Sequence, residues 1–526
     1  MPDAGGIDPC GPEGGGAPDD RRARTSAQAG GQGGGEDQAK RHSGMLPASG
    51  DPYHEGGPLF GPTALRSGVR TWHVTRAVVD KLITVRKGET LDLRGDLFGA
   101  RPVYVIESLD EVLVATSQQE LRRAGAVCGV EPQRLRAHLL GDSIEPLSGG
   151  VQRLQPGSRL TVEGGQARMR AAEPLEVEDL SERKSRDRLA TELQDRLGDA
   201  VDRMLGDHRP AISLGIGIDS ASLLALVEDR GPATWTLVSG PLDPDLLNTV
   251  RLAKHFGAQH NMFEARERTL PEKFEAAVLA SETVLWNPRA VAFYRLFCAM
   301  AEKHDVVMSG VGADELLMGH PSMIQGHEGA PPIARRFEDD RRLIRRLLAD
   351  DFQVPEPADR PAMAVDEARQ LMVRTTLRHD VLPMGARGSL APDLEVVFPY
   401  LDSQVAAFAL GLGEADLVGE RGLGKSLLRE GWKGIIPDAI RLRPHRVRLS
   451  PPGGGEAAVH KLWAELYESI LSEDCLKDLQ IVDRLKVRRL IGAYSSQTEY
   501  QHPGFGVMDR VLMRLSSLAV LQKALS

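Results

Sequence analysis

Two short glycine loops, each followed by acidic residues, are the stretches of this sequence whose residue types and spacing could do chemistry. The first, GIGIDS at 215–220, follows the apolar run 211–214, and the second, SGVGADE at 309–315, follows the apolar run 306–308. Glycine lets a backbone approach an anion closely, and a helix start presents unpaired N–H groups and a positive dipole end. Each loop could therefore hold phosphate, although a strand-to-helix turn without a ligand has a similar sequence.

A carboxylate follows the glycines of each loop. Asp219 is in the first loop, beside the hydroxyl of Ser220, and Asp314 is in the second. If the two apolar runs are strands of one parallel sheet, both carboxylates lie at the same edge of that sheet. Magnesium is commonly bound by one or two carboxylates together with phosphate oxygens. We therefore expect Asp219 and Asp314 to hold Mg²⁺ on a triphosphate.

Apolar runs alternate with helical segments beyond residue 210, and these elements must position the loops. The alternation predicts an α/β fold, in which a parallel sheet is covered by helices. Ligands of such sheets bind beyond the carboxyl ends of the strands, where both loops fall. The expected strands are 211–216, 234–240 and 305–310, and the expected helices are 220–229, 245–257 and 288–304.

Composition divides the chain into three parts. Residues 1–68 are rich in glycine and poor in large apolar side chains, which predicts a disordered tail or a true start at Met45. Residues 69–180 contain short β-type runs broken by Gly, Asp and Pro, which predict a mostly β domain. Residues 186–526 begin with an amphipathic helix and carry both glycine loops.

The overall composition excludes several classes of protein. The 41% of hydrophobic and 26% of charged residues are typical of a globular protein. The net charge of -9 predicts that the chain binds neither nucleic acid nor an anionic membrane. It has no apolar run of membrane-spanning length and no signal peptide, so we expect a cytoplasmic protein. The four scattered cysteines indicate neither a zinc site nor a disulfide framework.

The order of the motifs resembles that of the asparagine synthetase family. The two loops are similar to its SGGxDS and SGxGxDE motifs, residues 394–410 resemble GIExRxPFLD, and 424–446 resemble its K-x-x-L-R ending followed by R-x-x-K. Upstream, 92–105 resembles the end of the family's glutaminase-type domain. The resemblance implies a degenerate Ntn-type, β-rich (α+β) domain at 69–180. A synthetase domain of the pyrophosphatase-loop (adenine-nucleotide α-hydrolase-like) type would follow at 186–526.

The resemblance also implies a reaction. Magnesium ATP would activate a substrate carboxylate as an acyl adenylate, and an amine would attack it to give an amide with loss of AMP. Glu395 would accept the amine proton or orient the base, although an ion pair with Arg387 or Arg429 is the alternative for this residue. The other catalytic residues would be Lys425, Arg443 and Arg446. The ATP-binding residues would be Leu214, Gly215, Gly217, Asp219, Ser220, Ser239, Ser309, Gly310 and Gly312, with Asp219 and Asp314 on magnesium.

Three departures from the family pattern bear on function. No cysteine stands at position 2, where the family has its glutamine-attacking thiol, so we expect the β-rich domain to release no ammonia. Gly215 and Ile216 replace the serine and first glycine of the first loop, which removes a hydroxyl from the phosphate site. Arg446, or His445 in a shorter alignment, replaces the family's late lysine, and an arginine keeps the charge.

Without ammonia, the amine must come from a substrate. Among family branches of this kind, the lasso peptide cyclases join a peptide's N-terminal amine to an Asp or Glu side chain, and this is the expected function. The partners would then be a precursor core peptide and, in addition, a leader-processing protease and a leader-binding protein. The alternatives are a β-lactam or other small-molecule amide synthetase, or a non-catalytic homologue that serves as a partner protein.

One motif favours a different enzyme class. Residues 419–426, GERGLGKS, satisfy the Walker A pattern GxxxxGK[ST], which is typical of P-loop ATPases and kinases. However, the preceding segment is not a convincing buried strand, and no later apolar strand ends in a magnesium-binding Asp. We therefore expect these residues to belong to the K-x-x-L-R segment rather than to a P-loop.

Overall fold

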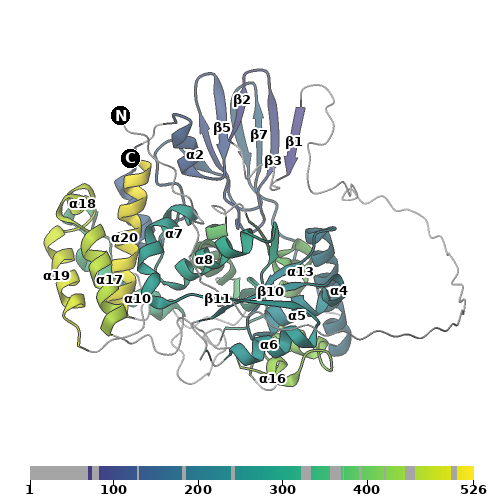
Figure 1. Ribbon diagram of the computed structural model, residues 1–526. Coiled ribbons are helices and arrows are strands. Elements are labelled where there is room, and N and C mark those ends of the chain that lie inside the picture. The colour runs from purple at the N-terminus through teal and green to yellow at the C-terminus, as the bar shows by residue number, and fades with distance from the viewer. Residues whose placement is uncertain are drawn as a thin grey trace, which may run out of the picture.

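The structure is a computed structural model (Figure 1), and it describes most of the chain beyond residue 68. The tail predicted at 1–68 lies outside the described residues, as do Ser239, His445 and Arg446. The described residues are 69–73, 82–126, 129–180, 185–238, 243, 245–320, 333–355, 369–370, 372–389, 394–419, 422–444, 457–498 and 506–526.

The N-terminal part consists of two four-stranded sheets that share one core. Their strand orders are β1-β3-β7-β8 and β2-β5-β4-β6, and every pair is antiparallel except β1 with β3. Alternate residues point inward, such as Leu91 and Leu93 of β3, and they pack on Val105 and Val114 of the other sheet. The strands are β1 (Val69–His73), β2 (Ile83–Arg86), β3 (Thr90–Arg94), β4 (Tyr104–Glu107), β5 (Glu111–Ala115), β6 (Gln152–Arg153), β7 (Arg159–Glu163) and β8 (Gln166–Arg170).

The second part is built on a five-stranded parallel sheet of order β11-β10-β9-β12-β13. Its central strands are almost wholly buried, which explains their continuous apolar sequence. The predicted α/β fold class, with a β-rich domain before a parallel-sheet domain, is confirmed. The strands are β9 (Ala211–Ser213), β10 (Ala233–Val238), β11 (Gln259–Glu264), β12 (Val306–Met308) and β13 (Glu395–Val397).

Helices cover this sheet in the places that the sequence predicts. The chain enters through α4 (Arg186–Leu205), whose apolar stripe is buried and whose N-cap Ser185 accepts a hydrogen bond from the Arg188 N–H. The crossover helices are α5 (Ile218–Leu226), α6 (Leu246–His255) and α8 (Arg289–Ala301). Figure 1 shows α4, α5 and α6 packed around the strands in the lower half of the molecule.

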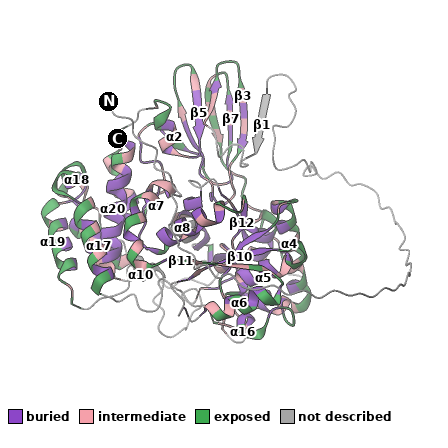
Figure 2. Ribbon diagram, viewed as in Figure 1, coloured by how far each residue is buried: buried purple, intermediate pink, exposed green. Residues whose placement is uncertain are grey.

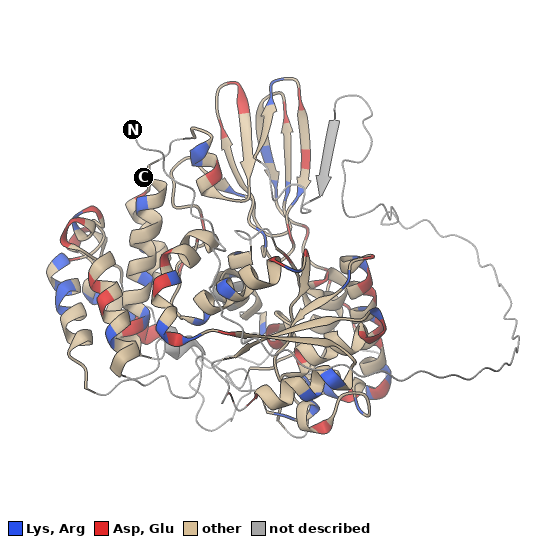
Figure 3. Ribbon diagram, in the orientation of Figure 1, with Lys and Arg blue, Asp and Glu red and all other residues tan. Residues whose placement is uncertain are grey.

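A third group of elements is a helical layer with its own core, on the left in Figures 1 and 2. Its central helix α20 is buried along most of its length, and Arg510 of that helix forms a buried ion pair with Asp340. Lys and Arg residues are interspersed with Asp and Glu residues along the outer helices (Figure 3). No described helix is both long and apolar enough to cross a membrane. The helices are α10 (Ile333–Leu347), α17 (Ala457–Ile470), α18 (Glu473–Asp478), α19 (Arg484–Ser495) and α20 (Val507–Leu525).

Polar contacts join the β-rich domain to the parallel-sheet domain. Glu282 accepts hydrogen bonds from Ser117 and from the backbone N–H groups of Gln118 and Gln119, so it caps α2 (Gln118–Arg123) from across the junction. The arrangement fixes the β-rich domain above the sheet, on the side away from α6 and α16 (Asp438–Arg441) in Figure 1.

Candidate functional site

The two glycine loops lie side by side at the carboxyl ends of β9 and β12. These strands are parallel neighbours, with Met308 opposite Ile212. A cavity of about 550 Å³ lies beyond the strand ends. Of the residues predicted for the site, the cavity is lined by Leu214, Gly215, Gly217, Asp219, Ser220, Ser309, Gly310, Gly312, Asp314, Lys425 and Arg443.

The first loop presents backbone and open space to the cavity. Gly217 is the N-cap of α5, and no described side chain caps the first N–H groups of this helix. The positive end of the helix dipole therefore faces the cavity, which Gly217 lines. A Cβ atom added to Gly215 or Gly217 would have no neighbour closer than 3.8 Å. The Ser220 hydroxyl accepts a hydrogen bond from the Gly215 N–H (3.0 Å) and donates one to its carbonyl (3.3 Å). Ser220 therefore fixes the shape of the loop.

The second loop is packed tightly against the first. A Cβ atom on Gly310 would lie 2.9 Å from Asp219 Cβ, and one on Gly312 would overlap the side chain of Leu401. Gly312 also has φ +98°, a conformation that favours glycine. Glycines in this loop allow β12 to approach α5, and they bring Asp314 next to Asp219.

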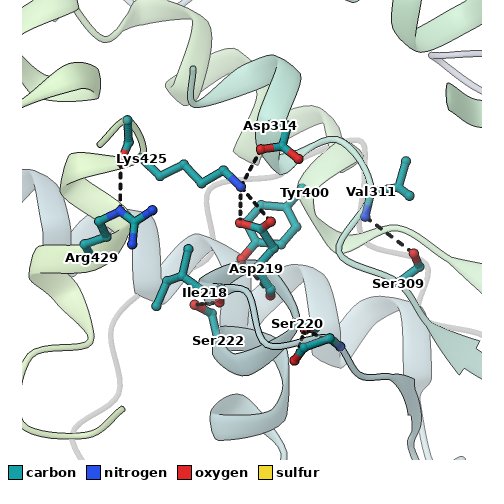
Figure 4. Close-up of polar contacts among 12 residues, drawn as sticks. Ile218, Asp219, Ser220, Ser222, Ser309, Val311, Asp314, Tyr400, Lys425 and Arg429 are labelled. Carbon is teal, nitrogen blue, oxygen red and sulfur yellow. Dashed lines mark hydrogen bonds and ion pairs between the residues drawn. The ribbon is translucent and has the colours of Figure 1, made fainter. Parts of the chain in front are cut away.

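Lys425 joins the two carboxylates that the sequence predicts to hold magnesium (Figure 4). Its Nζ lies 2.6 Å from both carboxylate oxygens of Asp219 and 2.6 Å from Asp314 Oδ1. The lysine side chain is 3% exposed, whereas Asp219 and Asp314 are 19% and 28% exposed. Burial alone lowers the pKa of Lys425, but the two carboxylates outweigh this effect and raise it, so the ammonium is charged.

The main chain around Lys425 has an unusual conformation that places the ammonium there. Lys425 has φ +53°, and its N–H donates to the carbonyl of Leu317 (3.0 Å). The preceding segment is α14 (Glu414–Val418), a helix rather than the buried strand that a P-loop requires. The structure therefore contradicts the Walker A alternative for 419–426, as the sequence context predicts.

The carboxylate pair fits magnesium bound together with a nucleotide. In the described part of the chain, no cluster of three His, Cys, Asp or Glu side chains could hold a metal ion by itself. Magnesium nevertheless commonly takes only one or two protein carboxylates when substrate phosphates supply further oxygens. Asp219 and Asp314, at the edge of a cavity that also contains the α5 N-terminus, meet this requirement.

Two further side chains shape the electrostatics around this pair. Burial, and then the neighbouring Asp314 carboxylate, raise the pKa of Glu315 to about 8. The hydroxyl of the fully buried Tyr400 donates to the Asp219 carbonyl (3.1 Å), and burial raises its pKa well above the usual range. Tyr400 therefore supports the turn that carries Asp219.

Glu395, predicted as a catalytic residue, lies apart from the other predicted site residues that the structure describes. This residue begins β13 opposite Val306, at the amino end of the sheet, and it does not line the cavity. Its carboxylate forms an ion pair, as the alternative for this residue expects, but the partner is Arg101 of the β-rich domain at 2.8 Å and not Arg387 or Arg429. A strand rises about 3.3 Å per residue, so the two residues from Glu395 to Val397 place it roughly 7 Å from the carboxyl edge.

Of the other cationic residues predicted for the site, the structure describes only one. Arg443 lines the cavity and pairs with Asp245 at 2.8 Å, whereas Arg446 and Ser239 lie outside the described residues. Arg429 also lines the cavity, and its guanidinium binds the carbonyls of Gly424 and Arg441. It therefore supports the loop before Lys425.

Several polar residues that line the cavity were not predicted. Asn287 and Arg289 stand at the start of α8, and the Asn287 Oδ1 accepts a hydrogen bond from the Arg289 N–H at 2.8 Å. Asp243 and Asp245 follow β10, and Glu267 follows β11. The rule that ligands gather beyond the carboxyl ends of strands could have found Asp243 and Asp245, because they follow the expected strand 234–240. It could not have found Glu267, because β11 was not among the expected strands.

Comparison with known proteins agrees with this geometry. The family described as "Asparagine synthase" matches residues 192–516, which contain both glycine loops and Lys425. The chain is 22% identical over 409 residues to "Asparagine synthetase [glutamine-hydrolyzing] 1" of Bacillus subtilis, covering 66% of this chain and 63% of that protein. It is 25% identical over 286 residues to a Gallus gallus asparagine synthetase, covering 52% of this chain and 44% of that protein.

The human asparagine synthetase matches over a shorter stretch, with 27% identity over 257 residues, 46% of this chain and 39% of that protein. The chain thus spans between about two fifths and two thirds of the length of these relatives. The family match covers more than half of the chain and coincides with the parallel-sheet domain and its cavity. The chain belongs to the asparagine synthase family.

Proposed function

We propose that this protein uses magnesium ATP to activate a carboxylate as an acyl adenylate and then forms an amide with an amine. One observation carries this proposal: two glycine loops and a carboxylate pair, from neighbouring strand ends, converge in one cavity with a helix N-terminus. This arrangement provides both an oxyanion site and a divalent-metal site.

The residues would divide the work by position. The α5 N-terminus and the first loop would hold phosphate oxygens, and Lys425 and Arg443 would supply positive charge. Asp219 and Asp314 would hold Mg²⁺, which neutralises charge on the phosphates when it is bound. The chain's main contribution is therefore to orient the acyl carbon and the amine and to stabilise the leaving pyrophosphate and AMP.

The finer part of the proposal is macrolactam formation on a peptide, as in lasso peptide cyclases. Cys128 is the one cysteine that the sequence places in 69–180, and it lies outside the described residues. The described β-rich residues contain no cysteine, since the described cysteines are Cys298 and Cys475, so they supply no thiol to release ammonia from glutamine. Leu247 and Val250 of α6 are exposed beside the cavity-lining Leu246 and Thr249. The apolar side chains of a peptide substrate could pack on these two exposed residues.

A small-molecule amide synthetase, such as one that closes a β-lactam, is the second candidate. It is favoured by the volume of the cavity, about 550 Å³, which is within the range of small-ligand sites. A non-catalytic partner protein is the third. Nucleotide turnover separates the enzymes from the partner protein, and the size of the ring in the product separates the two enzymes.

The first test is thermal unfolding with and without magnesium ATP. At one hundred times its dissociation constant the nucleotide should stabilise the protein by about 2.7 kcal/mol. Asp219→Ala should abolish the shift, because it removes a metal ligand, whereas Asp229→Ala, at an exposed position just beyond α5, should retain it. Equal shifts in the two variants would contradict the proposed site, and no shift in the wild type would favour the partner protein.

The substrate is tested by mass spectrometry. A peptide with a free N-terminal amine and an internal Asp or Glu should lose one water as the protein converts ATP to AMP. The same peptide with an acetylated N-terminus is the matched control and should not react. ATP conversion with small amino acids but not with peptides would favour the second candidate.

A further inference from the structure

Lys425 occupies the position between the two carboxylates that magnesium would share. Its Nζ contacts Asp219 and Asp314 at 2.6 Å, from strand ends that the sheet holds side by side. Two carboxylates at this separation repel each other, and the ammonium compensates that repulsion. In the described structure this position is therefore already filled by a positive charge that belongs to the chain.

The surrounding backbone is shaped to keep the ammonium there. Met318 and Lys425 have φ +54° and +53°, and they account for two of the three described non-glycine residues with positive φ. Gly424, with φ +68°, would overlap the Met318 carbonyl if it had a Cβ atom. A Cβ atom on Gly319 would overlap both Lys425 Cε and Asp314 Oδ1. Strain of this kind persists only where the rest of the structure enforces it.

A divalent ion and the Lys425 ammonium compete for the same oxygens. An ion that arrives alone must displace a buried ammonium, which then has to find new acceptors in a mostly apolar cavity. An ion that arrives on a triphosphate brings those acceptors with it, because phosphate oxygens can take over the lysine. The chain thus distinguishes a bare metal ion from a metal–nucleotide complex.

We propose that Lys425 is the resident counter-cation of the Asp219–Asp314 pair, and that a divalent ion enters this pair only together with the phosphates of a nucleotide. This inference rests on the proposed function, because it concerns the same metal and nucleotide. Lys425 positions the carboxylates before binding and excludes bare ions, and it exchanges carboxylate for phosphate oxygens when the nucleotide arrives.

The test is binding of Mn²⁺, followed by electron paramagnetic resonance, with and without ATP. Wild-type protein should bind Mn²⁺ only when ATP is present. Lys425→Met should bind Mn²⁺ alone, at least tenfold more tightly than the wild type does, and added Mn²⁺ should raise its melting temperature. The matched control is Lys433→Met, which removes an exposed lysine beyond α15 (Ser426–Gly431) and should behave as the wild type. Lys425→Met combined with Asp314→Asn should lose the gained binding.

Two results would overturn the inference. One is that the wild type binds Mn²⁺ without ATP as tightly as with it, and the other is that folded Lys425→Met gains no metal binding. If Lys425→Met does not fold, Lys425→Gln takes its place, and the wild-type titration alone remains decisive. Failure of the wild type to bind Mn²⁺ with ATP would instead contradict the proposed function, so the two failures are distinguishable.

Discussion

The two glycine loops look alike in sequence but differ in what their glycines do. The two loops follow neighbouring parallel strands, and each loop contains an aspartate whose carboxylate forms an ion pair with Lys425. In the second loop, side chains at 310 and 312 would collide with Asp219 and Leu401. In the first loop, a Cβ at 215 or 217 would have no neighbour within 3.8 Å.

This difference indicates that glycine has a different role in each loop. Gly310 and Gly312 are needed by the protein itself, since the second loop must touch the first. All four glycines line the cavity, but only Gly215 and Gly217 have open space beside them, which a ligand could fill. Substitutions in the second loop should therefore cost stability, whereas substitutions in the first should change binding.

Gly312→Ala should have the largest effect on stability. It combines a backbone conformation unfavourable for alanine with an overlap onto Leu401, and together these should cost roughly 2–4 kcal/mol of unfolding free energy. Urea unfolding measures this loss. The control is Gly231→Ala, where φ is +60° but nothing lies within 4 Å, so that only about 1 kcal/mol should be lost. Equal losses at the two positions would show that Leu401 moves aside.

Gly310→Ala should have an intermediate effect. Its Cβ would lie 2.9 Å from Asp219 Cβ, and its φ is not positive, so the strain falls on the position of Asp219, the aspartate that we propose as a magnesium ligand. We expect a loss of about 1–2 kcal/mol in stability and a weaker melting shift with magnesium ATP. A full shift with magnesium ATP in this variant would mean that Asp219 is not fixed by the second loop.

Gly215→Ser should have the smallest effect on stability, within about 0.5 kcal/mol of the wild type. The family has a serine at this position, and its hydroxyl could donate one hydrogen bond to a phosphate. One hydrogen bond of roughly 1 kcal/mol should tighten magnesium ATP binding about fivefold in calorimetry. Gly215→Ala, which lacks the hydroxyl, should show no such gain in affinity. If both variants unfold as easily as Gly312→Ala, the distinction between the loops is wrong.

The sequence predicts the framework of the site well, and the reason is local. Buried parallel strands are continuous apolar runs, so 211–213 and 306–308 could be recognised without a structure. Because ligands bind at the carboxyl ends of such strands, the meeting of Asp219 and Asp314 followed from strand direction alone.

Features that depend on register or on distant contacts could not be predicted in this way. Glu395 belongs to a short strand, and only its pairing with Val306 reveals that it lies at the amino end of the sheet. The contact between Lys425 and Asp219 joins positions 206 residues apart. It depends on a loop conformation that neither apolar periodicity nor a motif encodes.

The close contact between the Met318–Gly319 turn and the loop that carries Lys425 also constrains how this sequence can change over time. A side chain at 319 and a lysine at 425 exclude each other, so neither position can drift independently. A lineage that lost Lys425 would remove one of the two overlaps at position 319, and a change of Asp314 would remove the other. A larger residue at 319 would then prevent the lysine from returning, so the loss of the lysine would become irreversible once positions 314 and 319 had both changed.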